Sequence, residues 1–363
     1  MPDTTEDAGA PDDVLLDREA LLARLRGMLA AESSGALRDM AGGLLAELDD
    51  PAGPLRSGDG ARVCFTNGYL QAEIAQAVAA QTLERARYYI ERIIRGVTEE
   101  RRAPINDLNL NRWKAYDDIL TDSLWIVERR DSSGAHSAEY WGNFIPQIPY
   151  QLMRRYTRAG EWVLDPFAGS GTTLIEAQRL GRNALGVELQ PPIAAAARAR
   201  VASEPNRHHV VCEIRAGDST TTDFRALLRE HGRESAQLAI LHPPYHDIIR
   251  FSDDPRDLSN AADLDAFLGL LGAVVERVAA ALERGRYLAL VIGDRYTRGE
   301  WIPLGFRAMD TVAARGFLLK SLVVKNFEAT TGKRAQKELW RYRALAGGFY
   351  VFKHEYIFIF RKV

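Results

Sequence analysis

Residues suited to chemistry gather in two short segments of this chain, a glycine-rich turn at 165–173 and a tetrapeptide at 242–245. Around the turn, the sequence WVLD predicts a short buried strand, FAGSG a tight turn and TTLIEAQRLG a helix. Gly169 and Gly171 carry no Cβ, so the backbone can turn sharply there and approach a ligand closely. The N-terminus of the following helix favours a negatively charged group. These features predict a site for a ligand that carries such a group.

A second predicted strand, ALGVEL, ends near Glu188, which lies 17 residues after Gly171. A carboxylate at this place binds the ribose hydroxyls in a Rossmann-type βαβ unit. A phosphate-binding P-loop is excluded, because GSGTT stands where a Lys would have to follow the glycines. A nicotinamide fingerprint is weak, because Leu174 occupies the place of its third glycine. We therefore expect a nucleoside cofactor with a methionine carboxylate at the helix N-terminus.

The tetrapeptide His242-Pro243-Pro244-Tyr245 directly follows another predicted strand. Ligands of a doubly wound sheet bind outside the carboxyl ends of the strands, so the tetrapeptide and the glycine turn should face one crevice. The two prolines fix the backbone and leave carbonyl oxygens free to accept hydrogen bonds. The tyrosine offers a flat face on which a base can stack. Acceptors of this kind suit methylation of an exocyclic amine, because they can bind its hydrogens and draw its nitrogen toward tetrahedral geometry.

The sequences VLDPFAGSGTT and HPPY resemble the cofactor and catalytic motifs of the S-adenosylmethionine-dependent DNA amino-methyltransferases, which act on cytosine N4 or adenine N6. The resemblance extends over about residues 140–363 and includes the segment 140–160 before the first strand. It implies that a flipped-out base stacks on Tyr245. The implied catalytic residues are His242, Pro243, Pro244 and Tyr245. The implied cofactor-binding residues are Asn143, Phe144, Pro146, Asp165, Phe167, Gly169, Gly171, Thr172, Glu188 and Asp218.

The chain departs from the family pattern at two points. His242 stands where the family usually has Asp, Asn or Ser, although a neutral imidazole can still accept one hydrogen bond through one ring nitrogen. The cofactor turn also precedes the tetrapeptide, which indicates a different circular permutation from the common one. We expect a DNA methyltransferase that prefers cytosine N4 to adenine N6 and serves restriction-modification, phage defence or epigenetic marking.

Two other functions stay open at this point. One is methylation of a base in RNA or tRNA, and the other is a non-catalytic subunit that binds cofactor and nucleic acid for a partner. Cytosine C5 methylation is disfavoured, because neither Cys64 nor Cys212 lies at a suitable strand end to serve as a nucleophile. The histidines and cysteines show no metal-ligand spacing, so we expect no metal.

A net charge of −2 means that any contact with nucleic acid must be local. The segment 320–343 is basic and contains Trp340 and Tyr342, which suits phosphate contact and base stacking in a loop between two strands. An ordinary solvated surface is the alternative interpretation. The residues predicted to bind nucleic acid are Lys325, Lys333, Arg334, Lys337 and Arg341. The arginine-rich N-terminal helices are the other candidate for this contact.

The predicted fold is α/β, a Rossmann-like class I methyltransferase sheet of seven strands, doubly wound, with an N-terminal helical region. Residues 1–13 predict a disordered tail, 14–130 the helical region and 131–363 the methyltransferase domain. One long helix is expected to start at Thr66 or Asn67, and it could pack within its own domain, form a homodimer contact or clamp nucleic acid. The acidic N-terminus lacks a hydrophobic signal core, so a cytoplasmic location is expected.

Overall fold

The structure is a computed structural model and describes residues 13–57, 60–137, 140, 142–297, 299–326 and 337–363. The predicted disordered tail lies outside the described residues, except that Asp13 begins the first strand. The chain divides into two compact units. Unit 1 holds residues 1–104 and 108–118, and unit 2 holds 105–107 and 119–363. Residues 119–130, which we assigned to the helical region, therefore belong to unit 2.

Unit 1 contains a two-stranded antiparallel sheet that the sequence analysis did not predict. Leu15 and Leu16 were assigned to a helix because apolar residues recur there at helical spacing, but they pair with Cys64 and Val63 of a second strand. Helices pack around a core that includes Leu16 and Ile90, both fully buried. The elements are β1 (Asp13–Asp17), α1 (Arg18–Leu29), α2 (Ser34–Asp49), α3 (Pro54–Ser57), β2 (Arg62–Thr66), α4 (Asn67–Ala79), α5 (Leu83–Thr98) and a short 3-10 helix at Leu110–Ala115.

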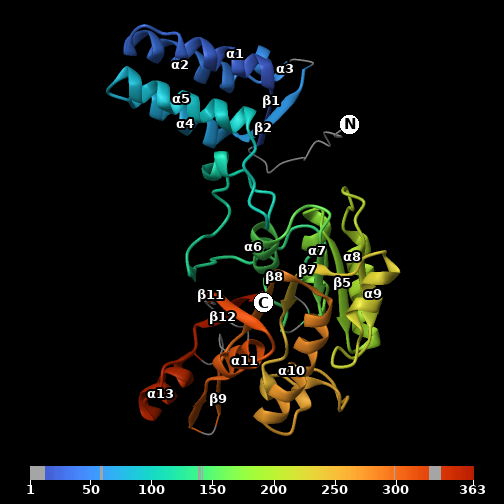
Figure 1. Cartoon of the computed structure of the whole chain (residues 1–363). Helices are drawn as coiled ribbons and strands as arrows, with labels where there is room; N and C mark the ends of the chain where they lie inside the picture. Colours follow the sequence, from blue (N-terminus) through green and yellow to red (C-terminus); the bar gives the residue numbers. More distant parts are fainter. Residues whose placement is uncertain (1–12, 58–59, 138–139, 141, 298, 327–336) are drawn as a thin grey trace. The chain divides into compact units, whose positions relative to one another are not determined.

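The prediction of one long helix from Thr66 or Asn67 is wrong, because the chain forms two helices, α4 and α5 (Figure 1). The break falls before Thr82, whose side chain accepts a hydrogen bond from the backbone N–H of Arg85 at 3.2 Å and caps α5. Ile74 of α4 and Ile90 of α5 are both fully buried in the core of unit 1. The apolar face that suggested a dimer contact is thus covered within its own unit.

Unit 2 is built on a mixed sheet with the strand order β3-β11-β12-β8-β7-β4-β5-β6. Strands β4 to β8 are parallel, whereas β12 runs antiparallel to both β8 and β11. The predicted α/β sheet is confirmed, and the short edge strand β3 adds an eighth strand to the seven expected among the described residues. The strands are β3 (Leu124–Trp125), β4 (Trp162–Asp165), β5 (Asn183–Glu188), β6 (Cys212–Ala216), β7 (Ala236–Leu241), β8 (Leu282–Ile292), β11 (Phe317–Asn326) and β12 (His354–Lys362).

Helices cover both faces of this sheet, because successive strand residues point to opposite sides (Figure 1). Val163 of β4 faces one apolar core, formed with α6, α7 and α8. Its neighbour Leu164 faces the other core, formed with α9, α10 and α11. The helices are α6 (Gln147–Tyr156), α7 (Thr172–Arg179), α8 (Pro191–Ser203), α9 (Phe224–Glu230), α10 (Leu264–Ala281) and α11 (Leu304–Ala313). Within the described part of the chain, no helix combines the length and apolar character needed to span a membrane.

The strand order reverses between β4 and β7, since the chain runs outward through β5 and β6 and then returns to add β7 and β8 on the other side. The crevice at the carboxyl ends of strands beside such a reversal is where doubly wound sheets bind ligands. Several short elements lie in the connections of this half of the unit. These are two 3-10 turns, η2 (His246–Ile248) and η3 (Leu258–Asn260), the hairpin β9 (Arg295–Thr297) and β10 (Glu300–Ile302), and helix α13 (Lys337–Gly347).

Candidate active site

A pocket that is open to solvent lies where β4, β5, β6 and β7 end. Nine of the residues singled out in the sequence line it, namely Asn143, Phe144, Phe167, Gly169, Glu188, Asp218, His242, Pro243 and Pro244. Five others, Pro146, Asp165, Gly171, Thr172 and Tyr245, do not line it. The structure therefore brings the glycine turn and the tetrapeptide to one pocket.

Residues of the turn itself stabilise the glycine turn between β4 and α7. The Asp165 carboxylate accepts a hydrogen bond from the backbone N–H of Phe167 at 2.9 Å, and burial raises its pKa to about 6. Gly169 and Gly171 have φ of +48° and +87°, where a residue with a Cβ is strained. A Cβ on Gly171 would also lie 3.1 Å from Val201. Asp165 and Gly171 thus shape the turn, while Gly169 exposes its backbone to the pocket.

Glu188 ends β5 as predicted and is only 7% exposed. Its two carboxylate oxygens accept backbone N–H groups, one from Gly169 at 3.0 Å and one from Gln190 at 2.9 Å. Burial raises the pKa of this carboxyl. Each oxygen keeps a second lone pair with which it can accept a ribose hydroxyl. Apolar side chains such as Phe144 and Phe167 line the same pocket, so the donor and acceptor set fits a nucleoside.

Asp218, at the end of β6, lines the pocket and also makes a local turn. Its Oδ1 accepts hydrogen bonds from the backbone N–H of Thr220 at 2.9 Å and from the hydroxyl of the same residue at 2.7 Å. The Asp218 side chain therefore forms this turn and also presents a carboxylate to the pocket.

Tyr140 and Phe251 are pocket residues that the sequence analysis did not identify. Their rings stack with centroids 6.3 Å apart, and they come from the segments next to the two motifs. Burial raises the pKa of Tyr140, and the negative charges of Glu188 and Asp257 raise it further. A Cβ on Gly169 would lie 3.2 Å from the Tyr140 ring, so this glycine is needed for the close approach. In the sequence, the only indication that these two residues belong to the pocket was an aromatic residue near each motif.

His246 fixes the loop that carries Phe251 and Asp257 into the pocket. It is buried and adopts a φ of +53°, in the left-handed region that few residues other than glycine occupy. Its Nε2 lies 3.1 Å from the backbone oxygen of Ala261 and donates to it, so Nδ1 is left to accept from Arg295 at 2.6 Å. These contacts compensate for the strained backbone.

Asn143 is held in the pocket by its neighbours. The hydroxyl of Thr172 donates a hydrogen bond to Asn143 Oδ1 at 2.7 Å, and Asn143 Nδ2 donates to the backbone oxygen of Ser137 at 3.1 Å. Thr172 thus positions a pocket residue without lining the pocket itself. Pro146 directly precedes α6 and does not line the pocket.

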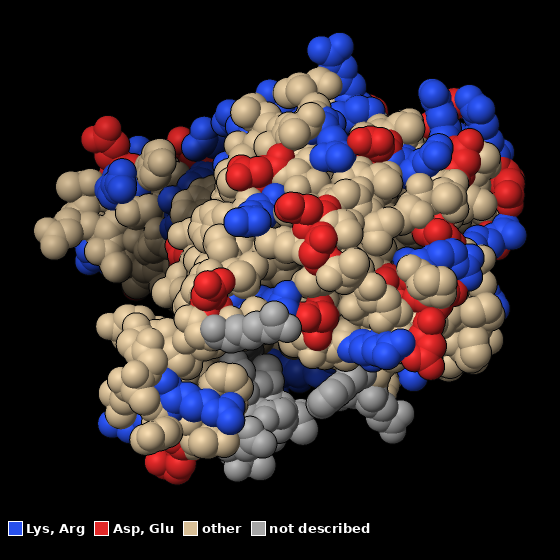
Figure 2. All heavy atoms as spheres, turned by 90° about the horizontal axis from the view of Figure 1, so that it is seen from below, with Lys and Arg blue, Asp and Glu red and all other residues tan. Residues whose placement is uncertain are grey.

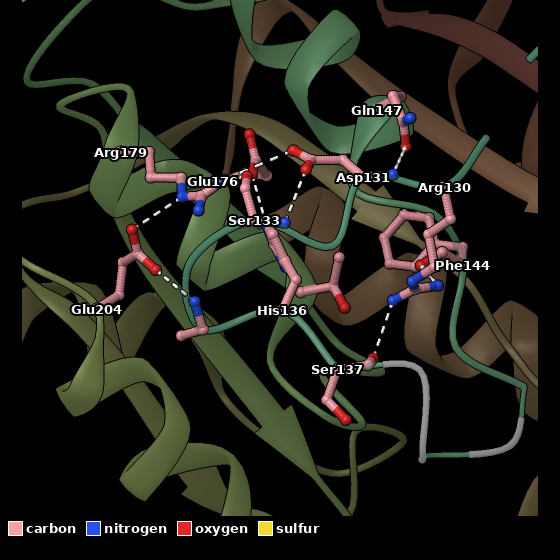
Figure 3. A network of polar contacts seen from close by, with 12 residues as sticks. Arg130, Asp131, Ser133, His136, Ser137, Phe144, Gln147, Glu176, Arg179 and Glu204 are labelled. Carbon is pink, nitrogen blue, oxygen red and sulfur yellow. Dashed lines mark hydrogen bonds and ion pairs between the residues drawn. The ribbon is translucent and has the colours of Figure 1, made fainter.

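A polar network fastens the segment before Asn143 to α7 (Figure 3). Arg179 of α7 lies between Glu204 on one side and Asp131 and Glu176 on the other, at 2.9, 3.6 and 3.3 Å. The fully buried side chain of His136 lies 2.6 Å from Glu176. Although Asp131, His136 and Glu176 are close enough to share a metal ion, the Arg179 guanidinium already supplies positive charge to the carboxylates of Asp131 and Glu176, as well as to Glu204. We interpret this network as structural, because it joins the segment before Asn143 to α7.

Replacing Gly134 with alanine should destabilise unit 2 by more than 1 kcal/mol, because Gly134 has a φ of +59° and a Cβ there would overlap Arg179 and Glu204. Urea unfolding of the two proteins measures the difference. Gly232→Ala is a matched control, since Gly232 has a φ of +68° but no atom within 4 Å of the added Cβ. Equal losses in the two variants would show that the network tolerates the intrusion.

His242 and Tyr245 of the tetrapeptide belong to a second buried network. The His242 ring packs on Phe144 with centroids 4.8 Å apart, and its Nε2 lies 3.2 Å from the Tyr245 hydroxyl. That hydroxyl donates to Glu355 of β12 at 2.8 Å. The Tyr245 ring packs closely on Gly293, where a Cβ would lie 3.1 Å away. Tyr245 therefore contacts this network and not the pocket, and its stacking on a target base stays a prediction.

The pKa of His242 is lowered to about 4, first by burial and then by the positive charge of Lys325, while Glu355 opposes the shift. The ring should thus stay neutral between pH 8 and pH 5, and its NMR signals should not titrate there. Because an unfolded histidine takes up its proton near pH 6.5, acidification below that value favours the unfolded chain, by up to about 1.4 kcal/mol per pH unit. His242→Asn should lose less stability over that range. A His242 midpoint near pH 6.5 in the folded protein would contradict this account.

The residues predicted to bind nucleic acid differ in their position and exposure in the structure. Lys325 is wrong as a phosphate contact, because it is 4% exposed and forms an ion pair with Glu355 at 3.1 Å inside unit 2. It lies in strand β11, not in a loop, because the strand extends to Asn326. Arg341 is exposed on α13. Lys333, Arg334 and the side chain of Lys337 lie outside the described residues. On the face in Figure 2, described basic and acidic side chains are interspersed, in keeping with a local contact.

Sequence comparisons relate part of this chain to known proteins. Residues 76–199, which include the glycine turn, match a family described as DNA methylase. The Type II methyltransferase M.MjaII of Methanocaldococcus jannaschii is 40% identical over 75 residues, which cover 20% of this chain and 14% of that protein. M.MthZI of Methanothermobacter thermautotrophicus is 37% identical over 79 residues, 22% of this chain and 21% of that protein. M2.DpnII of Streptococcus pneumoniae is 35% identical over 100 residues, 26% of this chain and 34% of that protein. The matches therefore span between 14% and 34% of these relatives.

Solved structures with a similar fold include TrmN from Thermus thermophilus, with a TM-score of 0.38 and 16% identity over 61% of this chain and 49% of that one. A SAM-dependent methyltransferase from Methanosarcina mazei has a TM-score of 0.39 and 14% identity over 58% of this chain and 97% of that one. Because both TM-scores are below 0.5, the assignment of the fold rests on the strand order of the sheet and not on these two structures. The family match confirms S-adenosylmethionine as the cofactor expected for the pocket. The glycine turn lies inside the segment that is similar to the DNA methylase family, and the structure brings the tetrapeptide to the same pocket.

Proposed function

We propose that this protein methylates an exocyclic amino group of a base in DNA, with cytosine N4 preferred to adenine N6. The observation that carries the proposal is the meeting of the glycine turn with His242, Pro243 and Pro244 in one pocket at the strand ends. When bound, S-adenosylmethionine supplies an electrophilic methyl group. Gly169, Glu188 and Asp218 would hold it, through the backbone at the turn and through two carboxylates.

The tetrapeptide would bind the amine through acceptors. No backbone N–H of the described residues donates to the backbone oxygens of Pro243 and Pro244, so these oxygens are offered as acceptors for the amine hydrogens. A neutral His242 can accept one hydrogen through one ring nitrogen. With a pKa of about 4, His242 would act as a hydrogen-bond acceptor and leave the final proton to water. Binding the hydrogens in this way orients the nitrogen lone pair for direct attack.

A base inside a duplex cannot reach a partly buried imidazole that lines a pocket, so the target nucleotide would have to leave the stack, at a cost of a few kcal/mol. The pocket offers aromatic surface to offset that cost, because the rings of Phe144, Tyr140 and Phe251 all line it. Digestion of methylated DNA to nucleosides and mass spectrometry should reveal N4-methylcytosine. N6-methyladenine alone would overturn the preference for cytosine, and a methyl group on any ring carbon would overturn the proposed chemistry.

Among the described residues of the basic segment, helix α13 offers a contact for DNA phosphates, because Arg341 and Arg343 are exposed beside the exposed ring of Tyr342. Replacing Arg341 with alanine should weaken DNA binding by a similar factor for all sequences. It should also reduce the slope of log K against log salt by about 0.9, the effect of one lost phosphate contact. Fluorescence anisotropy at several salt concentrations measures both quantities.

Arg233→Ala is the matched control, since Arg233 is exposed at the amino end of β7, the end of the sheet opposite the pocket. An unchanged slope for the Arg341 variant, or an equal change in both variants, would exclude α13 as the phosphate contact.

A further inference from the structure

Glu355 and Lys325 form a buried ion pair that the proposed chemistry does not use. They are paired across the adjacent strands β12 and β11, and they are 7% and 4% exposed. Lys325 Nζ lies 3.1 Å from Glu355 Oε1. Removing two charges from water is costly, so a buried pair persists where further hydrogen bonds satisfy it. The second carboxylate oxygen, Glu355 Oε2, is satisfied by the hydroxyl of the tetrapeptide residue Tyr245 at 2.8 Å.

The chemistry of these groups fixes the direction of each hydrogen bond. A carboxylate paired with an ammonium group can only accept, so the single proton of the Tyr245 hydroxyl points to Glu355. The Tyr245 oxygen can then only accept from His242 Nε2, which lies 3.2 Å away. The ring proton of a neutral His242 must therefore reside on Nε2.

The opposite nitrogen, His242 Nδ1, then carries a lone pair. It has no hydrogen-bond partner within the part of the chain that the structure describes, and His242 lines the pocket. An amine is a donor, so only this tautomer presents it with an acceptor. The reversed tautomer would place an N–H against the amine hydrogens and repel them.

We propose that Glu355 is a positioning residue that holds His242 in its Nε2–H tautomer through Tyr245, so that Nδ1 can accept a hydrogen from the target amine. The role of Nδ1 rests on the proposed function, whereas the tautomer itself does not. Lys325 contributes by keeping a carboxylate oxygen at Oε1. The device would explain how a histidine serves at a position where an amide, carboxylate or hydroxyl oxygen is usual.

Glu355→Gln tests the proposal, because the positive charge of Lys325 should fix the orientation of the new amide group. The glutamine oxygen should face the Lys325 ammonium, which leaves its NH₂ group to donate to the Tyr245 oxygen. The Tyr245 hydroxyl would then donate to His242 Nε2, and the ring proton would move to Nδ1. In the double variant Lys325→Met with Glu355→Gln, the amide is free to turn back, and the Nε2–H tautomer should return.

Long-range ¹H–¹⁵N spectra of the full chain labelled with ¹⁵N-histidine distinguish the two tautomers, and His242→Asn identifies the signals of His242. We expect Nε2–H in the wild type, Nδ1–H in Glu355→Gln and Nε2–H in the double variant. In parallel, kcat should fall at least about 10²-fold in Glu355→Gln with little change in the KM for cofactor, in line with other tautomer-setting carboxylates. The double variant should recover much of kcat.

Nδ1–H in the wild type, or an unchanged tautomer and kcat in Glu355→Gln, would overturn the proposal. Should Glu355→Gln fail to fold, Tyr245→Phe removes the same link, and its His242 signals should become those of a tautomer mixture. Unchanged signals there would likewise overturn it. If no variant and no wild-type protein methylates any nucleic acid while the tautomer switches as expected, the proposed function fails and the positioning by Glu355 stands.

Discussion

Replacing His242 with alanine should lower kcat for methyl transfer by about 10²–10³-fold, the usual cost of removing one positioned hydrogen-bonding group from a reaction centre. The substitution removes the side-chain acceptor and leaves the backbone oxygens of Pro243 and Pro244 in place. The Kd for S-adenosylhomocysteine should change by less than about threefold, because hydrogen bonds within the glycine turn hold the cofactor side of the pocket. Single-turnover kinetics at saturating cofactor, together with calorimetric titration, measure the two effects separately.

His242→Asn is the matched control for this prediction. Asparagine restores an acceptor oxygen and is one of the residues usual at this position in the family. Its kcat should stay within about tenfold of the wild-type value, since the chemistry needs an acceptor and not an imidazole. Loss of the same magnitude in both variants would show that His242 has a role that an acceptor cannot replace. Full activity in the alanine variant would remove His242 from the reaction.

The second large effect concerns Glu188. Glu188→Gln should raise the Kd for S-adenosylhomocysteine by about 10- to 100-fold, since hydrogen bonds to a charged group contribute about 1.5–3 kcal/mol. The carboxylate accepts from the backbone N–H of both Gly169 and Gln190. A glutamine has one oxygen for these two donors, so its NH₂ group would face one of them. The substitution would therefore weaken both the proposed ribose contact and the glycine turn.

Glu213→Gln is the matched control for Glu188→Gln. Glu213 lies on the adjacent strand β6, contacts Arg215 and His231, and does not line the pocket. Isothermal titration calorimetry should give a wild-type Kd for this variant. If Glu188→Gln also binds with the wild-type Kd, the cofactor does not contact Glu188. If both variants bind weakly, the loss reflects general destabilisation of the sheet.

Local patterns in the sequence were sufficient to predict the centre of the site. The glycine turn, the strand ending at Glu188 and the tetrapeptide are each continuous stretches, and the rule that ligands bind at the carboxyl ends of strands brings them together. The apolar runs of β4, β5, β7 and β8 also predicted the sheet, because strands buried on both faces are almost uniformly hydrophobic.

The residues whose roles the sequence did not reveal act across the fold. Glu355 and Lys325 lie far along the chain from Tyr245, and only the antiparallel placement of β12 beside β8 and β11 brings them to it. Lys325 looked like a phosphate contact because its neighbours in the sequence are basic, and burial was not visible from composition. Phe251 and His246 depend on a loop whose strained backbone no periodic pattern reveals.

In unit 1, the periodicity of apolar residues was not sufficient to predict where helices end. The helical spacing of apolar residues continues from α4 into α5, so periodicity predicts one helix where the chain folds back. The signal that decides the question is Thr82, which caps α5, and a single threonine is a weak indicator beside a long apolar pattern. In the same way, β1 looked helical because its strand partner, β2, lies far ahead in the sequence.

Transfer of tritiated methyl from S-adenosylmethionine to unmethylated genomic DNA, measured with total RNA and the His242→Ala protein in parallel, shows whether this pocket methylates DNA. We predict label in DNA that is lost in the variant, and little or no label in RNA. Label found only in RNA, or tight binding of the cofactor with no label in either nucleic acid, would contradict the claim that this pocket methylates amino groups in DNA.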